Sequence, residues 1–336
     1  MEARSVQELP AGPEWLYEPK WDGFRCLAFR KDEDVLLQSK SAQPLARYFP
    51  EVLDALRGLP AGRFVLDGEL VVARGGVLSF DDLLQRIHPA ESRIRRLAAE
   101  TPATLLAFDL LLEPRGGPLV ARPLGERRER LERFFEPVPE GGLVRLSPAT
   151  RDRRAAARWM RDLSSAGLDG VVAKELEAPY RSGEREGMRK VKLLRTADCV
   201  VGGFRYAQKG GEVGSLLLGL YDRAGLLHHV GFSSSFAAEE RRALKPIVEA
   251  RVGPPGFTGN APGGPSRWSS KRSTEWQPLR AGLVCEVRYD HFSGDRFRHG
   301  TKFLSWRPDK APAACTLAQV RPRGSGGLTR LGFGPG

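Results

Sequence analysis

The sequence lacks the features that mark three common classes of protein. Its 336 residues contain no apolar run near the roughly 18 residues that a membrane helix needs, and the first residues, MEARSVQELPAG, hold no apolar signal segment. Its four cysteines, Cys26, Cys199, Cys285 and Cys315, form no C-x-x-C pair, and its five histidines show no zinc-ligand spacing. We therefore exclude a membrane protein, a zinc ribbon and a disulfide framework, and expect reduced thiols in a cytoplasmic protein.

Acidic residues are fewer than basic residues, and the difference is unevenly distributed along the chain. The sequence holds 53 Lys and Arg against 41 Asp and Glu, a net charge of +12. From Thr196 to the end there are 20 basic and 11 acidic residues, whereas the 195 residues before it are nearly balanced, with 33 and 30. This distribution predicts a catalytic or nucleotide-binding front half joined to a polyanion-binding module. A soluble protein with a generally basic surface is the alternative that charge alone leaves open.

The pattern of apolar residues changes near Arg195–Ala197, where we expect a domain boundary. After it, short strand-like runs separated by Gly-containing turns are typical of a small antiparallel barrel. A Gly-, Pro- and Ser-rich stretch at 253–270 predicts a mobile loop, and residues 322–336 predict a disordered tail. Strands are expected at 22–30, 64–72, 104–112, 170–176, 199–206, 215–221, 226–232 and 283–289. Helices are expected at 126–135, 151–163 and 236–250, the last with a possible break at Pro246.

The most specific motif is EPKWDGFR, which runs from Glu18 to Arg25 and contains K-x-D-G-x-R. A lysine that stands just before a turn and a strand can be held rigidly, and nearby cations or partial desolvation make its amine nucleophilic. Arg25 can offer its planar guanidinium to a phosphate or a ribose oxygen. The alternative is a solvated lysine, Lys20, in an ordinary turn.

Charged residues also interrupt two apolar runs. Asp67 and Glu69 stand in an otherwise apolar strand, where they need a metal, a ribose hydroxyl or an arginine as partner. In the next run Phe108 precedes Asp109, and its ring could stack on a purine, although a core phenylalanine is the commoner case.

Lysines accompany the last strands of the front half. Asp169 and Lys174 flank a short apolar run, GVVA. Lys190 and Lys192 alternate along a predicted strand, which points both ammonium groups at one face. Like charges on one face repel each other unless an anion lies between them, so the pattern predicts a phosphate site.

In this order and spacing the motifs resemble those of the covalent nucleotidyltransferase superfamily, and specifically the ATP-dependent DNA ligases. KWDGFR is similar to motif I, VLDGELV to motif III, AFDLL to motif IIIa, GLDGVVAK to motif IV, KVK to motif V and RFRHGTKFLSWRPDK to motif VI. The resemblance covers nearly the whole chain and is greatest to the small stand-alone bacterial ligases of the C type. It implies an α+β protein, with a ligase-type adenylyltransferase domain at 1–195 and an OB-fold barrel at 198–321.

The resemblance also implies a role for individual residues. Lys20 would be the nucleophile that takes AMP from ATP, and Glu69 and Asp169 would hold Mg²⁺ or Mn²⁺. Arg307 and Lys310, with Asp309, would orient the pyrophosphate. The residues implied to contact the nucleotide are Glu18, Arg25, Lys40, Glu69, Phe108, Lys174, Lys190, Lys192, Arg307 and Lys310.

The sequence departs from the family pattern in three places. Motif IV usually has Glu where this chain has Asp169, and Lys40 stands where the family has an arginine, so a bidentate contact is lost. Leu304-Ser305 replaces residues that are commonly basic in similar ligases.

The function predicted from these features is the ATP-dependent sealing of nicks in duplex DNA by a monomeric, nucleoid-associated repair enzyme, with repair polymerases as partners. An RNA ligase or a GTP-using capping enzyme would share this chemistry. A catalytically inactive nucleic-acid-binding OB protein is the alternative from a different class.

Overall fold

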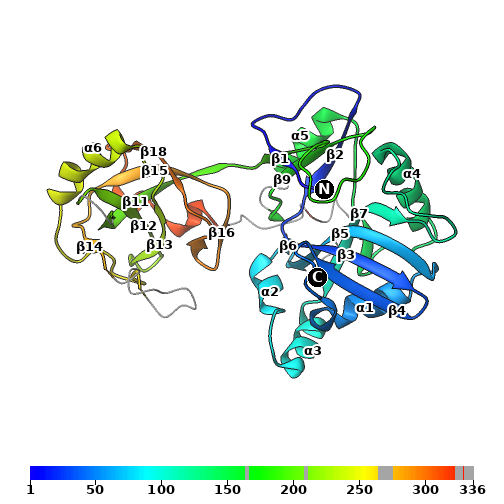
Figure 1. Ribbon diagram of the computed structural model, residues 1–336. Helices are drawn as coiled ribbons and strands as arrows, with labels where there is room; N and C mark the ends of the chain where they lie inside the picture. Colours follow the sequence, from blue (N-terminus) through cyan, green and yellow to red (C-terminus); the bar gives the residue numbers. More distant parts are fainter. Residues whose placement is uncertain (163–165, 208–210, 264–274, 322–327, 329–336) are drawn as a thin grey trace. The chain divides into compact units, whose positions relative to one another are not determined.

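The computed structural model describes residues 1–162, 166–207, 211–263, 275–321 and Leu328 (Figure 1). The chain divides into two compact units, Met1–Leu193 and Leu194–Arg321, and Leu328 is grouped with the first. No helix in these described ranges is both long and apolar enough to cross a membrane. Of the predicted loop at 253–270, residues 264–270 lie outside the described residues, and so does the predicted tail apart from Leu328, which is buried beside Trp21.

Two sheets form the first unit. The smaller has the order β1-β10-β9-β2, and the larger has the order β4-β3-β5-β7-β8 with β6 beside β5. The strands of the smaller sheet are β1 (Arg4–Ser5), β2 (Trp15–Lys20), β9 (Gly170–Glu175) and β10 (Met188–Lys192). Those of the larger sheet are β3 (Phe24–Lys31), β4 (Asp34–Ser39), β5 (Arg63–Arg74), β6 (Val77–Leu78), β7 (Ala103–Leu112) and β8 (Val144–Leu146).

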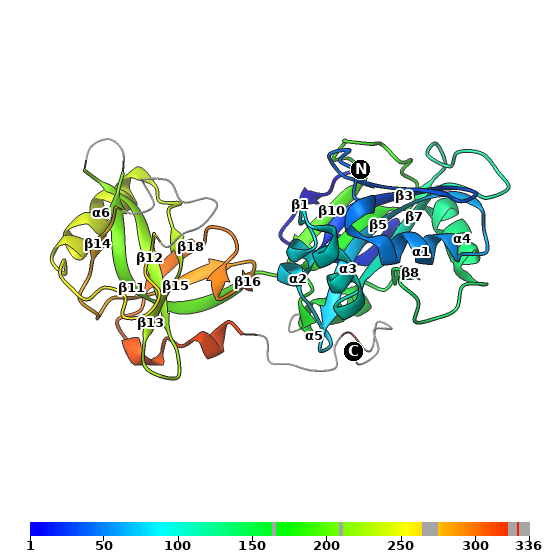
Figure 2. The same ribbon diagram turned by 90° about the horizontal axis from the view of Figure 1, so that it is seen from below.

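Helices cover one face of each sheet (Figures 1 and 2). The apolar side chains of α1, α2 and α4 pack with those of the larger sheet around Phe49 and Leu66, while α5 packs on the smaller sheet beside Tyr17 and Val171. Because side chains alternate along a strand, the opposite faces carry Glu18 and Lys20 on β2 and Asp67 and Glu69 on β5. The helices are η1 (Ala46–Tyr48), α1 (Pro50–Arg57), α2 (Phe80–Gln85), α3 (Glu91–Glu100), α4 (Leu124–Phe135) and α5 (Arg153–Asp162).

The second unit is built on an antiparallel sheet of order β13-β12-β11-β15-β18, with β14 beside β11 and a separate β16-β17 pair. Its core is apolar and includes Val200, Phe204 and Leu217. The strands are β11 (Arg195–Tyr206), β12 (Val213–Tyr221), β13 (Leu227–Ser233), β14 (Gln277–Pro278), β15 (Val284–Tyr289), β16 (Phe292–Ser293), β17 (Arg296–Phe297) and β18 (Lys302–Trp306). The helices are α6 (Ala238–Glu249), η3 (Pro312–Ala314) and η4 (Leu317–Gln319).

The barrel of the second unit is not fully closed. No strand ladder joins β13 to β18 within the described ranges; the two edges approach through a single bridge between Ser233 and Thr301. The hydroxyl of Ser233 donates to the Thr301 carbonyl at 2.9 Å and accepts from the Phe303 amide at 3.0 Å. The Ser233 side chain therefore makes hydrogen bonds at a place where a continuous ladder would have bonds between backbone groups. The barrel is partly open.

The predicted strands and helices are confirmed to within a few residues, with one difference that matters for the site. Lys20 stands just before a turn and β3, as expected, but it is also the last residue of β2, a strand that was not predicted, and neither were α1, α2 and α3. Pro246 does not break α6, which runs from Ala238 to Glu249.

Candidate active site

Lys20 stands at the end of β2 and is fixed from several directions. Its backbone pairs with Gly170 of β9, and its carbonyl accepts a hydrogen bond from the Asp169 amide at 3.1 Å. The next residue, Trp21, is buried and donates its indole N–H to Ser147 Oγ at 2.9 Å. A Cβ on Gly170 would lie 2.0 Å from the Val191 carbonyl, so only glycine allows the close pairing opposite Lys20. The Lys20 ammonium contacts the Asp169 carboxylate.

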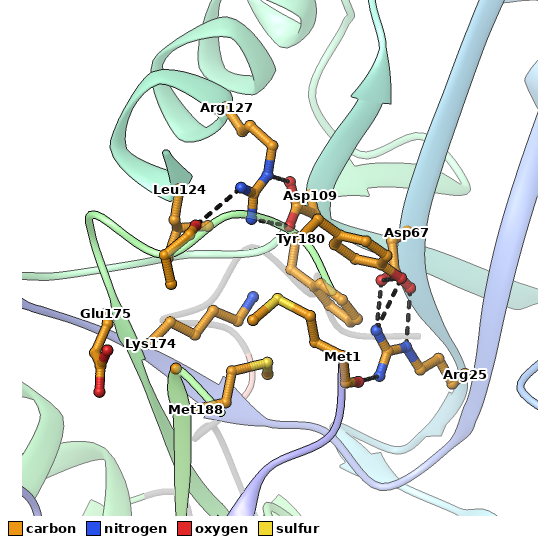
Figure 3. Close-up of a pocket in the computed structure, with 13 residues that line it drawn as sticks. Met1, Arg25, Asp67, Asp109, Leu124, Arg127, Lys174, Glu175, Tyr180 and Met188 are labelled. Carbon is orange, nitrogen blue, oxygen red and sulfur yellow. Dashed lines mark hydrogen bonds and ion pairs between the residues drawn. The ribbon is translucent and has the colours of Figure 1, made fainter. Parts of the chain in front are cut away.

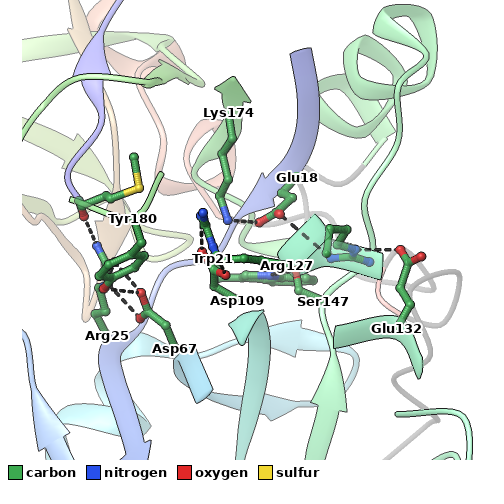
Figure 4. Close-up of polar contacts among 12 residues, drawn as sticks. Glu18, Trp21, Arg25, Asp67, Asp109, Arg127, Glu132, Ser147, Lys174 and Tyr180 are labelled. Carbon is green, nitrogen blue, oxygen red and sulfur yellow. Dashed lines mark hydrogen bonds and ion pairs between the residues drawn. The ribbon is translucent and has the colours of Figure 1, made fainter. Parts of the chain in front are cut away.

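Glu18, two residues before Lys20 and on the same face, is almost fully buried (Figure 4). Its Oε2 forms an ion pair of 2.7 Å with the ammonium of Lys174, whose side chain is only 6% exposed. Its Oε1 lies 3.9 Å from Arg128 and has no hydrogen-bond partner among the described residues. A buried carboxylate oxygen without a donor is costly, so Glu18 presents an acceptor that a ligand can satisfy.

Phe108 occupies a β-bulge in β7. The register pairs Asp67 with Asp109 and Gly68 with Ala107, so Phe108 is the extra residue between them. Bulges re-aim side chains, and two cations lie over this ring: Lys174 Nζ at 4.4 Å and the Arg25 guanidinium at 5.7 Å from its centroid. The ring of Phe108 therefore lies next to charged groups and is not part of the apolar core.

Arg25 is bound by the protein itself. Its Nε and Nη2 donate to Asp67 at 3.0 and 2.6 Å, and its Nη1 donates to the Met1 carbonyl. Burial alone would lower the pKa of Arg25, but the charge and hydrogen bonds of Asp67 raise it overall. These groups border a pocket that Lys174 and Phe108 also line (Figure 3).

Two carboxylates lie near Lys20 and could hold a metal ion. Burial raises the pKa of Glu69 to about 8, against the lowering effects of Lys20 and Arg25. Asp169 is almost fully buried beside Lys20. No group of three potential ligands occurs among the described residues. Mg²⁺ often binds through one or two carboxylates together with substrate phosphates, so this pair of carboxylates fits the ion.

The lysines of β10 belong to a wider basic cluster. Burial and then the charges of Lys20, Lys192, Arg185 and Lys40 lower the pKa of Lys190. Glu2 contacts this cluster through ion pairs with Lys40 at 2.7 Å and Arg185 at 3.2 Å. Because these cations repel one another, the cluster is suited to bind phosphate groups.

The structure brings Lys20 together with Glu18, Glu69, Asp169 and Lys190. Arg25, Phe108 and Lys174 line the neighbouring pocket of the same unit, and Lys40 and Lys192 belong to the basic cluster around Lys190. Arg307 and Lys310 belong to the second unit, where Arg307 pairs with Asp198 at 2.9 Å and with Asp309 at 2.9 Å, and Lys310 pairs with Asp198 at 3.3 Å. Asp198 and Asp309 therefore hold these two cations in the segment after β18.

Sequence analysis missed the residues that support the site. Asp67 was expected to need a partner, and an arginine, Arg25, is that partner, but its role in holding Arg25 was not foreseen. Tyr180 donates its hydroxyl to Asp67 at 2.9 Å, and nothing in the sequence around it marked it. Ser147 was not marked either, although the polar residue within an apolar segment is a signal that could have found it.

Comparisons with known proteins agree on one family. Residues 3–192 match the family model described as ATP dependent DNA ligase domain, and residues 209–310 match ATP dependent DNA ligase C terminal region. The chain is 46% identical to DNA ligase C1 of Mycolicibacterium smegmatis, over 91% of this chain and 88% of that protein. It is 42% identical to DNA ligase C of Mycobacterium tuberculosis, over 95% of this chain and 92% of that protein.

A solved structure from work on Lig E DNA ligases matches with a TM-score of 0.54 at 17% identity, covering 91% of this chain and 100% of that chain. At this identity the likeness supports the fold alone, a nucleotidyltransferase unit followed by an OB fold.

Proposed function

The chain belongs to the ATP-dependent DNA ligase family, and we propose that it seals nicks in duplex DNA through an AMP adduct on Lys20. The observation that carries this proposal is the convergence on Lys20 of an acceptor carboxylate, Asp169, and a cluster of cations around Lys190. This arrangement is what an amine needs to attack an anionic phosphate.

In the first step, Nζ of Lys20 attacks the α-phosphorus of ATP. A P–N bond forms and the P–O bond to pyrophosphate breaks. The Lys20 ammonium must lose a proton beforehand, and the Asp169 carboxylate in contact with it is positioned to accept that proton. Lys190 and Lys192 would neutralise charge on the phosphate oxygens. AMP would then pass to the 5′-phosphate at the nick and leave when the 3′-hydroxyl attacks.

A divalent cation, Mg²⁺ or Mn²⁺, would be held by Glu69 and Asp169. When bound it supplies charge neutralisation at the phosphates. The raised pKa of Glu69 supports this assignment, because a cation would stabilise the ionised carboxylate that burial disfavours.

The pocket near Glu18 would receive the base of the nucleotide. Phe108 offers an aromatic face for stacking, and Glu18 Oε1 offers an acceptor without a donor. Adenine carries an exocyclic amine where guanine carries a carbonyl oxygen, so a carboxylate acceptor favours ATP over GTP. Incubation with labelled ATP or GTP, followed by denaturing electrophoresis, should label the protein from ATP alone; label from GTP alone would overturn the assignment.

Arg307 and Lys310, with Asp309, would orient the pyrophosphate leaving group. Their present partner Asp198 shows that both guanidinium and ammonium can share one anionic group. A phosphate would take the place of that carboxylate during the first step.

The substrate and cellular role are further parts of the proposal. The basic second unit and its OB fold suit backbone contacts to nicked duplex DNA. We assign the enzyme to DNA repair as a cytoplasmic, nucleoid-associated monomer that works with repair polymerases, on its similarity to the DNA ligases named C. A sealing assay with nicks bounded by DNA or by RNA strands separates this reading from an RNA ligase: faster sealing of an all-RNA nick would contradict it.

A further inference from the structure

Two buried aspartates lie side by side behind the proposed nucleotide pocket. Asp67 of β5 and Asp109 of β7 are cross-strand partners, and their exposed fractions are 0% and 4%. Neighbouring buried carboxylates repel each other and lose hydration, so each needs a cation and hydrogen-bond donors.

Each aspartate has its own arginine. Asp67 accepts two bonds from Arg25, and Asp109 accepts two from Arg127 at 2.8 and 3.0 Å. Arg127 is fully buried and also donates to the carbonyls of Arg122 and Ala178. Both ion pairs are bidentate, the geometry that fixes a guanidinium in one orientation.

Tyr180 connects the two pairs (Figures 3 and 4). Its hydroxyl donates to Asp67 Oδ2 at 2.9 Å and accepts from Arg25 Nη2 at 3.3 Å. The guanidinium of Arg127 lies over its ring, 5.8 Å from the centroid. The ring and the hydroxyl therefore make separate contacts. A phenylalanine at this position would keep the contact of the ring with Arg127 and lose the hydrogen bonds of the hydroxyl.

Tyr180 also joins the two sheets. It lies in the connection from β9 to β10, both strands of the smaller sheet, whereas Asp67 belongs to the larger sheet. The proposed nucleotide contacts are divided in the same way: Lys20 and Lys174 come from the smaller sheet, and Phe108 comes from the larger. A bond between the sheets at this place sets the distance between the two halves of the pocket.

We propose that Tyr180 is a positioning residue for ATP binding, whose hydroxyl holds Asp67, and through it Arg25, at the edge of the pocket beside Phe108. This inference rests on the proposed function, because it assumes that the nucleotide binds between Lys20 and Phe108. The hydroxyl is not needed to neutralise Asp67, which Arg25 already does; its contribution is to fix the guanidinium relative to the smaller sheet. Its loss should weaken nucleotide binding more than folding.

The test compares Tyr180→Phe with Tyr17→Phe in the full chain. Tyr17 is the control, since its hydroxyl also donates a hydrogen bond, to the Pro10 carbonyl at 2.7 Å, but its side chain packs on the α5 side of the smaller sheet. Both changes are made in a Lys20→Ala background, in which no adduct forms, and the dissociation constant of labelled ATP is measured by equilibrium dialysis. Tyr180→Phe should raise this constant at least about fivefold, whereas Tyr17→Phe should leave it unchanged.

A purely structural role for the Tyr180 hydroxyl would give a different result. The melting temperature would fall while the dissociation constant of the folded protein stayed equal to that of Tyr17→Phe, and this outcome would overturn the inference. Adduct formation by the chain with Lys20 intact is assayed separately with labelled ATP. Its absence would overturn the proposed function, while the binding constants would still decide the role of Tyr180.

Discussion

The two units of the chain place their ion pairs in different surroundings. In the first unit, Arg127 with Asp109 and Lys174 with Glu18 have side chains that are at most 6% exposed. In the second unit, the side chains of Arg307 and Lys310 are 29% and 37% exposed where they pair with Asp198. Buried pairs hold one geometry because breaking them leaves a charge without hydration, whereas exposed pairs contribute little and exchange partners readily.

This difference matches a division of labour between the units. In the proposed reaction, the buried ion pairs of the first unit would fix the groups around Lys20 before ATP binds, which favours catalysis by preorganised electrostatics. The second unit carries most of the net positive charge, with 20 basic and 11 acidic residues from Thr196 onward, around an apolar core. Its exposed cations are suited to phosphates that come and go.

The largest expected effect is at the proposed nucleophile, Lys20. Lys20→Ala and Lys20→Arg should abolish the protein–AMP adduct, because alanine has no amine and arginine stays protonated. Both variants should still seal a pre-adenylated nick to some degree, since that substrate bypasses the first step. Denaturing electrophoresis after incubation with labelled ATP measures the adduct, and strong labelling of Lys20→Ala would refute the assignment.

The carboxylates of the first unit should affect activity far more than folding. Glu69→Ala and Asp169→Ala should lower nick sealing at least about 100-fold, which corresponds to about 2.7 kcal/mol of transition-state stabilisation. Glu113→Ala is the control, because it removes another carboxylate of the same unit, one that pairs with Arg130 at 2.5 Å away from the proposed site. Sealing rates and melting temperatures are measured on the same preparations; a large drop in melting temperature with near-normal turnover would assign Glu69 and Asp169 to folding.

The sequence pattern predicted the candidate catalytic and metal-binding residues more completely than the residues that hold them in place. Lys20, Glu69 and Asp169 belong to contiguous motifs, so their chemistry is readable from local pattern. The pairing of Asp67 with Tyr180 joins positions 113 residues apart, and only the folded sheets bring them together. Likewise the bulge at Phe108 depends on the register between β5 and β7, which no single strand specifies.

The fold shows the same limit. Long alternating runs gave the main strands correctly, because a two-residue period persists whatever the neighbours are. The same runs indicated a barrel but not how far it closes, because closure depends on how the Ser233 and Thr301 edges meet, and here a side chain replaces part of the ladder. The short helix α2 has only six residues and was missed, since so short a segment shows little periodicity.

In the second unit, a change to an exposed cation should separate the steps of the reaction. Arg307→Ala should slow adduct formation roughly 50-fold while sparing closure of a pre-adenylated nick. Arg321→Ala is the control, because it removes an exposed arginine of the same unit that pairs with Asp295 at 3.0 Å. Single-turnover rates for the two steps are compared, and equal losses in both would assign Arg307 to DNA binding or folding instead.

The smallest expected effect concerns a buried histidine of the second unit. A positive charge on an exposed side chain of this unit is hydrated, whereas a positive charge on this buried ring would not be. His229 is 8% exposed, and its Nδ1 accepts a hydrogen bond from Arg296 at 3.2 Å, which requires a ring nitrogen without a proton. Burial, and then the charges of Arg296 and Arg205, lower the pKa of His229 to about 3. Because the folded pKa lies below the unfolded value of about 6.5, this group's contribution to stability is complete above that value and is lost as the pH falls toward 3. Between pH 7.5 and pH 5 the loss of folding stability should be about 2 kcal/mol.

Hydrogen exchange measured at both pH values on peptides from each unit should show this loss in residues 194–321. His229→Gln should remove the loss there, and peptides of residues 1–193 serve as an internal control. An unchanged pH dependence in His229→Gln would mean that other groups make the second unit sensitive to acid. Protonation of His229 in the core would then cost no more stability than protonation of an exposed histidine.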